Sequence, residues 1–208
     1  MEHDDDSVEE RTERILESAA ALASEGGFDA VRIRDVAARA NVALGTLYKR
    51  FSGKDEILMA VLEREVGLLE QAAGWFQHGG ATYLARVLGF FDPVTRALCA
   101  RVRFTGAVLR AVVSGEAGIS DKVGRFHDRI TTLIVAALRG ADGSSPPAET
   151  HSLTGAEEHE LAYILSQIWF AALVGWMGGL LTPVDVIARV ERATRLLVLG
   201  LQSGSAAR

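Results

Sequence analysis

Apolar residues recur at helical spacing along the whole chain. In the first such segment, Ile15, Ala19, Leu22 and Ala23 fall on one stripe of a helix. No alternation of apolar and polar positions is long enough to predict a strand. The pattern therefore predicts an all-α fold.

Glycine, proline and capping residues divide this pattern into about nine helices. We expect them at about Val8 to Glu25, Ile33 to Ala40, Leu44 to Phe51, Lys54 to Gln77, Ala81 to Phe91, Pro93 to Val113, Ser120 to Arg139, Ala156 to Leu181, and Pro183 to Gln202. Thr154 with Glu157 has the spacing of a capping box, and Thr182 with Asp185 caps the last helix. The connection between the last two helices is so short that they must pack antiparallel.

The second and third helices are short and are separated by a tight turn at Asn41 to Ala43. Two short helices across such a turn are typical of a helix-turn-helix. At 208 residues the chain has room for this small module and a medium-sized partner. We therefore expect a three-helix domain over residues 7–53 and a larger helical domain over residues 54–208.

The charge distribution singles out the same region. The formal net charge of −5 excludes a wholly basic nucleic-acid binder, so any DNA contact must come from a local patch. Such a patch surrounds the two short helices, where only Asp35 opposes the basic side chains of Arg32, Arg34, Arg39, Lys49, Arg50 and Lys54. Neutralised phosphates would give salt-sensitive binding, whereas charge alone would also fit an ordinary solvated face.

The remaining composition restricts location and chemistry. The single cysteine, Cys99, excludes a disulfide framework and a multi-cysteine zinc site, and the acidic N-terminus lacks the features of a signal peptide, so we expect a cytoplasmic protein. His127 and Asp128 are adjacent on a predicted helix and point in different directions, which disfavours a catalytic dyad. We expect no catalytic residues, no metal and no cofactor.

One uncharged segment, Leu161 to Leu181, is long enough to span a bilayer, which requires about 20 apolar residues in a helix. Gly175, Gly178 and Gly179 interrupt it, and no cluster of Lys or Arg flanks it to set an orientation. We therefore expect a helix buried in a protein interface and no membrane insertion.

The segments Phe28–Ala37 (FDAVRIRDVA) and Val42–Phe51 (VALGTLYKRF), followed by Lys54, resemble the DNA-binding domain of the TetR family. The resemblance covers about Thr12 to Leu62. It implies that the third helix enters the major groove of DNA. The chain departs from the family pattern at Asn41, where glycine is common, at Ala43, where Ser or Thr is common, and at Arg50, where His is common.

Each position of this motif also has a physical interpretation. Gly45 would let the backbone approach DNA, and Leu47 and Phe51 share one face that anchors the helix inward. The side chains left outside can reach base edges or phosphates, and the first turn of the next helix can hold a phosphate. The expected DNA contacts are Arg34, Ala43, Leu44, Gly45, Thr46, Tyr48, Lys49, Arg50 and Lys54.

Members of this family use the second domain to bind an effector and to dimerise, so the resemblance implies both. Apolar side chains with a few polar groups are typical of a small-molecule pocket. The candidates are Phe90, Phe91, Arg101, Phe104, Thr105, Phe126, His127, Thr131 and Trp169. This lining suits a lipid-like or steroid-like ligand, and the N-terminal third resembles repressors of steroid catabolism within the family.

We expect a homodimer through the last two helices, because an uncharged helix can bury its excess apolar surface against a two-fold partner. The expected interface residues are Ala171, Ala172, Gly175, Gly179, Val186, Val190, Ala193 and Leu197. The sequence thus predicts a transcription regulator, a repressor released from a palindromic operator by a small apolar or amphipathic ligand. The alternatives are a DNA-binding regulator without an inducer and a helical enzyme.

Overall fold

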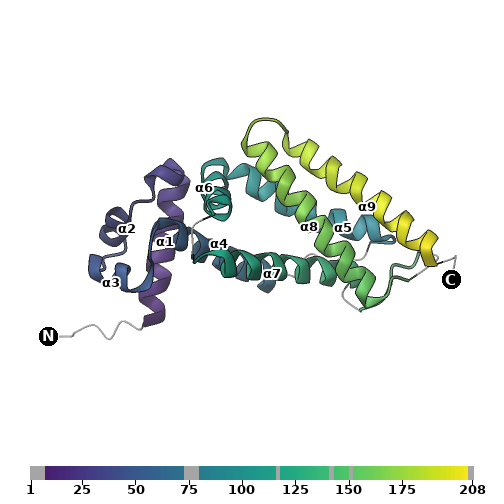
Figure 1. Cartoon of the computed structure of the whole chain (residues 1–208), viewed down its shortest axis with the longest axis horizontal. Coiled ribbons are helices and arrows are strands. Elements are labelled where there is room, and N and C mark those ends of the chain that lie inside the picture. Colours follow the sequence, from purple (N-terminus) through teal and green to yellow (C-terminus); the bar gives the residue numbers. More distant parts are fainter. Residues whose placement is uncertain (1–7, 73–79, 116–117, 141–142, 150–151, 206–208) are drawn as a thin grey trace. The chain divides into compact units, whose positions relative to one another are not determined.

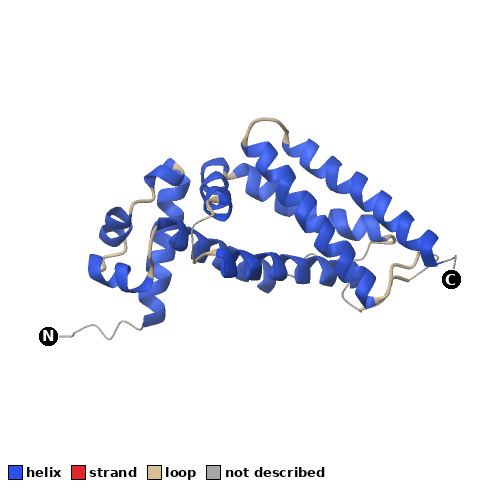
Figure 2. Cartoon of the chain, in the orientation of Figure 1, coloured by secondary structure: helices blue, strands red, loops and turns tan. Residues whose placement is uncertain are grey.

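The computed structural model describes residues 8–72, 80–115, 118–140, 143–149 and 152–205, and every regular element in those ranges is helical (Figures 1 and 2). The elements are α1 (Val8–Gly26), the short 3₁₀ helix η1 (Phe28–Ala30), α2 (Ile33–Arg39), α3 (Leu44–Arg50), α4 (Lys54–Gln71), α5 (Tyr83–Ala100), α6 (Val102–Val113), α7 (Ser120–Arg139), α8 (Gly155–Met177) and α9 (Pro183–Ser205). The all-α prediction is confirmed. The expected extension of the fourth helix to Gln77 lies outside the described residues.

One expected helix boundary is wrong. A break was expected just before Pro93, but this residue lies inside α5, and the chain leaves helical geometry at Arg101, with φ −103° and ψ 53°. A proline inside a helix costs about 3 kcal/mol. The fully buried Phe90 and Phe91 precede it and the buried Val94 follows it. Burial of these side chains, worth about 1.5–3 kcal/mol each, offsets the cost and keeps α5 continuous.

The chain packs as two compact units. Unit 1 contains the described residues up to Glu65 together with those from Arg101 to Val123, and unit 2 contains the rest. This grouping differs from the expected division after residue 53, because α6 packs against α1 and η1. A guanidinium N–H of Arg103 on α6 donates to the backbone oxygen of Glu25 at 2.5 Å.

The core of unit 1 holds the helix-turn-helix against α1. Ile15, Ala19 and Ala23 of α1 are buried, as the apolar stripe predicts. Gly27 ends α1 with φ +71°, a conformation that favours glycine, and its N–H donates to the oxygen of Ala23 at 2.9 Å. Arg64 of α4 forms ion pairs across to α1.

Unit 2 is built around α5, α8 and α9, with the later part of α7. Phe91 of α5 lies against Trp169 of α8, with ring centroids 5.3 Å apart, and the indole N–H of Trp169 donates to Thr95 Oγ1 at 2.9 Å. α8 begins with the expected capping box, in which the backbone N–H of Thr154 donates to Glu157 at 2.8 Å. The expected cap at Thr182 and Asp185 is also present, and α8 and α9 pack as an antiparallel pair (Figure 1).

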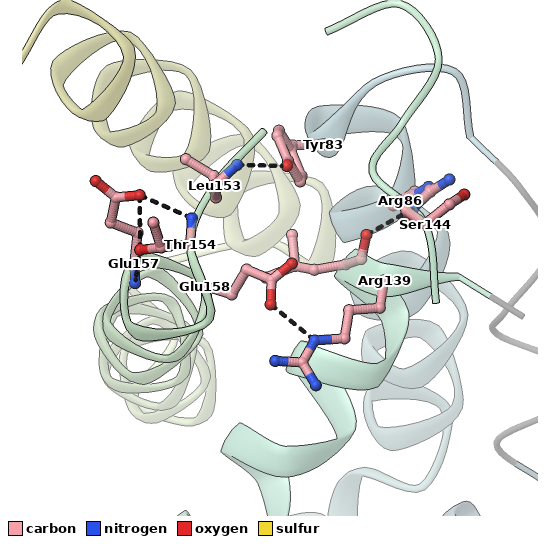
Figure 3. Close-up of polar contacts among 9 residues, drawn as sticks. Tyr83, Arg86, Arg139, Ser144, Leu153, Thr154, Glu157 and Glu158 are labelled. Atoms are coloured by element: carbon pink, nitrogen blue, oxygen red, sulfur yellow. Dashed lines mark hydrogen bonds and ion pairs between the residues drawn. The ribbon is translucent and has the colours of Figure 1, made fainter. Parts of the chain in front are cut away.

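Polar contacts fix the segment that leads into α8 (Figure 3). The N–H of Leu153 donates to the hydroxyl of Tyr83 at 2.9 Å. The buried Arg86 donates to the backbone oxygens of Leu138 at 2.8 Å and of Ser144 at 2.6 Å. Within unit 2, these contacts hold the segment before α8 against the start of α5 and the end of α7.

Among the described residues, α8 is the one helix that is long and apolar enough to cross a membrane by length and composition. It also supplies core side chains, since Leu161, Leu165 and Trp169 are buried inside unit 2. The core helix of a soluble protein meets the same two criteria, so this feature is weak evidence for a membrane span.

Candidate functional site

The orientation of α3 is set by two buried anchors. Leu47 is fully buried and Phe51 is buried at the end of the helix, as their spacing of four residues predicts. The backbone N–H of Phe51 donates to the oxygen of Leu47 at 2.8 Å. Because these two side chains point into unit 1, the remaining face of α3 turns away from the core.

That outer face carries the expected DNA-binding side chains. Tyr48 is 57% exposed, although large aromatic side chains are usually buried. Lys49 and Arg50 are exposed beside it, and Thr46 is half-buried. Arg34, on α2, is also exposed. Arg34, Lys49 and Arg50 form no ion pair with any of the described residues. These three cations are therefore available to an external anion.

The start of α3 shows two departures from ideal helix chemistry. Ala43 occupies the N-cap and makes no side-chain cap, as its residue type requires, and Leu44 follows it half-buried. Asn41 in the preceding turn has φ +53°, the left-handed region that glycine and asparagine tolerate best. This explains why asparagine can stand where glycine is common in the family.

Gly45 is not required by the packing of the protein. A Cβ at this position would meet no atom of the described residues within 4 Å, and the φ of Gly45 is not positive. A glycine inside a helix costs about 1 kcal/mol relative to alanine. The fold thus gains nothing from Gly45, and the open space above it leaves the backbone of α3 accessible from outside.

Lys54 is held by a small cluster at the start of α4. Its Nζ lies 3.8 Å from the centre of the Phe28 ring and 3.9 Å from an Asp29 carboxylate oxygen. Arg110 of α6 stacks on the same ring at 4.2 Å and pairs with the same carboxylate at 3.7 Å. Sequence reasoning missed Arg110, because it lies far along the chain and carries no motif.

A second polar cluster joins the end of α3 to α4 and α7. One oxygen of Glu56 accepts from the backbone N–H and the hydroxyl of Ser52, at 2.6 Å and 2.8 Å. The other accepts from Lys122 Nζ at 2.6 Å. Glu56 was not among the expected site residues, and nothing in the local sequence indicates that Lys122 reaches it.

The expected effector residues are divided between the two units. Arg101, Phe104 and Thr105 belong to unit 1, where Arg101 stacks 3.7 Å above the ring of Phe104 and pairs with Glu65 at 2.7 Å. The other six belong to unit 2. There, Phe90, Phe91 and Trp169 form one aromatic cluster.

A second group in unit 2 lies on α7. His127 packs between the rings of Phe126 and Phe170, and burial lowers its pKa. Thr131, one turn further along, is 1% exposed, and its hydroxyl oxygen has no hydrogen-bond partner among the described residues. Burying a hydroxyl without a hydrogen-bond partner costs free energy. Among the expected effector residues, Thr131 is therefore the one whose hydroxyl could gain a hydrogen bond from a bound ligand.

The expected dimer residues fall into two sets. Ala171, Gly175, Gly179, Ala193 and Leu197 are exposed or half-buried, and Ala172 lies beneath them. Val186 and Val190 are fully buried inside unit 2, so their expected place on an external face is wrong. Helical spacing showed that they share a face of α9 without showing that this face turns inward.

A groove of about 800 Å³ runs along α8 and α9. It is lined by Ala171, Ala172 and Gly175 of α8 and by Ala193, Leu196 and Arg192 of α9, among others. Leu196 is 66% exposed, and Leu180, between the two helices, is 82% exposed. Large apolar side chains at such exposure mark an interaction surface.

The exposed, basic recognition helix, held by two anchors in an all-helical chain, defines a helix-turn-helix DNA-binding protein. The profile of "Bacterial regulatory proteins, tetR family" matches residues 15–61, and that of "Tetracyclin repressor-like, C-terminal domain" matches residues 80–197. The chain belongs to the tetR family and is a DNA-binding transcriptional regulator.

Curated relatives agree with this assignment. The transcriptional repressor KstR of Mycobacterium tuberculosis is 32% identical over 189 residues, which cover 91% of this chain and 81% of the relative. KstR of Rhodococcus jostii is 32% identical over 192 residues, 91% of this chain and 83% of the relative.

Solved structures share the fold. A TetR regulator from Rhodococcus sp. RHA1 superposes with a TM-score of 0.71 at 24% identity, covering 92% of this chain and 96% of that chain. FadR from Bacillus subtilis, solved in complex with stearoyl-CoA, has a TM-score of 0.61 at 16% identity, covering 89% and 97% of the two chains.

The cluster around Glu56 predicts a pH-dependent stability. The hydrogen bonds from Lys122 and then from the Ser52 N–H lower the pKa of Glu56 from 4.5 to about 2. A carboxylate with a lowered pKa stabilises the folded state fully above its unfolded pKa and loses that contribution as the pH falls through its folded pKa. We expect Glu56→Gln to lower the free energy of unfolding by up to about 3 kcal/mol at pH 7 and by about half as much at pH 3.

Urea denaturation of both proteins at the two pH values measures this difference. Glu160→Gln, at an exposed position of α8, is the control and should change stability little at either pH. An equal loss for Glu56→Gln at pH 7 and pH 3 would contradict the ionic role of Glu56.

Proposed function

We propose that this protein is a cytoplasmic, homodimeric repressor. It binds a palindromic operator through α3 in the major groove, and an apolar or amphipathic effector bound in unit 2 releases it. The observation that carries the proposal is the outer face of α3, where Tyr48, Lys49 and Arg50 are exposed above a glycine that the fold does not require. The naming of the KstR relatives as repressors supports repression.

We assign three kinds of contact to the DNA face. Thr46, Lys49 and Arg50 face base edges, with Tyr48 and Arg34 on flanking phosphates. Ala43, Leu44 and Gly45 let the start of α3 approach the groove closely. Lys54 and the free N–H groups at the start of α4 hold a further phosphate, since helix N-termini attract anions.

Two substitutions test this face. Lys49→Met should weaken operator binding about tenfold or more at low salt and reduce the slope of log K against log salt by about one unit, because one phosphate or base contact is lost. Gly45→Ala should leave stability unchanged or raised by about 1 kcal/mol while operator affinity falls, because its methyl group meets only the DNA. Fluorescence anisotropy with an operator selected from random duplexes measures the affinities, and thermal unfolding measures stability.

Glu160→Gln, on unit 2, serves as the matched control. If operator affinity and its salt dependence are unchanged in both α3 variants, the proposed DNA-binding face is wrong. A fall in stability for Gly45→Ala would mean that this glycine serves the fold instead.

We propose that the second copy covers the groove along α8 and α9. In a two-fold interface each subunit presents the same surface, so the exposed apolar side chains of α9 bury one another. The small residues Ala171, Gly175 and Ala193 let the helices approach closely, with Gly179 and Leu197 at the edges. Binding to two half-sites one turn of DNA apart requires this dimer to present its recognition helices about 34–36 Å apart.

The dimer is tested by placing a charge in the groove. Leu196→Glu should shift the protein from dimer to monomer in sedimentation velocity at micromolar concentration, because burying a carboxylate costs several kcal/mol of desolvation, which an ion pair with Arg192 in the same groove offsets only in part. Operator affinity should fall with it. Leu68→Glu, at an exposed apolar position of α4, is the control and should remain dimeric. A Leu196→Glu protein that stays dimeric would place the interface elsewhere.

We assign the effector to the apolar core of unit 2. Its aromatic cluster of Phe90, Phe91 and Trp169 supplies a lining for a lipid-like or steroid-like ligand, with Phe126 and His127 on α7 beside Thr131. The Thr131 hydroxyl is the polar group that a ligand oxygen would satisfy. Arg101, Phe104 and Thr105 of unit 1 are set aside, because the Arg101 guanidinium is already paired with Glu65.

Thr131→Val tests this assignment, because valine keeps the shape and removes the hydroxyl. We expect apo stability to rise by about 1 kcal/mol, since a buried unpartnered group is removed, while affinity for the effector falls about tenfold. Stearoyl-CoA and a steroid carboxylic acid are the probes, and isothermal titration calorimetry measures their binding.

Thr132→Val is the control, because the Thr132 hydroxyl is exposed and already donates to the backbone oxygen of Asp128 at 2.9 Å. Equal probe affinity in Thr131→Val and the wild type would overturn the role of Thr131. If neither probe alters operator binding, a regulator without an inducer of this class is favoured.

A further inference from the structure

The carboxylate of Glu56 joins three segments of unit 1. Through one oxygen it holds Ser52, which directly follows the anchor Phe51 at the end of the recognition helix. Through the other it holds Lys122, in the first turn of α7, at 2.6 Å. The turn that ends α3 and the start of α7 are therefore bound to the same side chain.

The contact with Ser52 is explained by ordinary helix capping. A glutamate in the first turn commonly reaches back to an N–H that precedes the helix, and Glu56 does this for Ser52. That role needs no lysine. The side chains of Glu56 and Lys122 are each only 21% exposed, so the pair forms at a cost in desolvation and in lysine side-chain entropy. Capping therefore leaves Lys122 unexplained.

Lys122 lies on a helix that extends from unit 1 into unit 2. α7 begins in unit 1 and continues from Gly124 into unit 2. There it carries Phe126 and Thr131, which the proposed function places at the effector. A helix rises about 1.5 Å per residue, so Thr131 lies about 14 Å along the axis from Lys122. Any displacement of α7 along its axis reaches Lys122 directly.

We infer that Glu56 and Lys122 form a positioning pair that couples α7 to the turn ending the recognition helix. When α7 holds Lys122 in place, the Glu56 carboxylate is fixed, and it fixes Ser52 and the end of α3. A shift of α7 by about 1–2 Å takes a contact of 2.6 Å beyond hydrogen-bond distance and releases the turn. This inference rests on the proposed function, since it supplies the route by which the effector lowers operator affinity.

The test compares two ion pairs that join the same two helices. Lys122→Met removes the charge and keeps an apolar stem, while Lys122→Arg keeps the charge. Arg129→Met is the matched control: Arg129 of α7 pairs with Glu70 of α4 at 2.6 Å, and both residues belong to unit 2. Operator affinity, the fold-change in affinity caused by the active probe, and hydrogen exchange of the Ser52 amide are measured for each.

We expect Lys122→Met to weaken operator binding about 5- to 20-fold and to reduce the fold-change caused by stearoyl-CoA or the steroid acid, while probe affinity itself stays within about twofold. Exchange of the Ser52 amide should accelerate several-fold. Lys122→Arg should restore all three values. The double variant of Glu56→Gln and Lys122→Met should bind the operator no more weakly than the single variant with the lower operator affinity. Arg129→Met should leave operator affinity and Ser52 exchange unchanged.

Several outcomes would overturn the inference. One is unchanged Ser52 exchange and operator affinity in Lys122→Met. Another is an equal loss of affinity in Arg129→Met, which would indicate a general effect of helix packing. The Lys49→Met protein separates this failure from failure of the proposed function: if it loses operator binding while Lys122→Met does not, the DNA face stands and only the positioning pair is wrong.

Discussion

The burial of Leu47 and Phe51 is the interaction on which the rest of this protein depends. α3 has seven residues, no side-chain cap and an internal glycine, so it would not be stable by itself. Each buried anchor contributes about 1.5–3 kcal/mol, which is enough to hold so short a helix against unit 1. The same two contacts fix which side of α3 faces outward, and therefore which residues can reach DNA.

The charged residues of unit 1 serve two different purposes. Some hold helices together: Arg64 joins α4 to α1, and Arg103 joins α6 to the end of α1. Others, such as Lys49 and Arg50, are exposed on α3 without an ion-pair partner in the described part of the chain. Lys54 lies between these groups, because Asp29 and Phe28 hold it while it stays close to the start of α4. A count of basic residues cannot separate these purposes, since it does not show which cations are already paired.

Unit 2 explains why one of its helices resembles a membrane span. α8 is apolar on more than one side: Leu161, Leu165 and Trp169 face the core, while Tyr163 and Met177 remain exposed. A helix that is apolar all round requires partners all round, and the core of unit 2 supplies them for one side of α8. In the proposed dimer a second copy covers the other side.

The sequence by itself determined the features that are local. The helices, their caps at Thr154 and Thr182, and the anchors of α3 follow from spacings of three or four residues, which a helix converts directly into contacts. Tertiary structure alone decided which face of α9 turns inward, that α5 continues through Pro93, and that Lys122 meets Glu56 across 66 residues of chain. Helical periodicity shows which side chains share a face, but only the packing of distant elements selects the face that is buried and the partner that each charge finds.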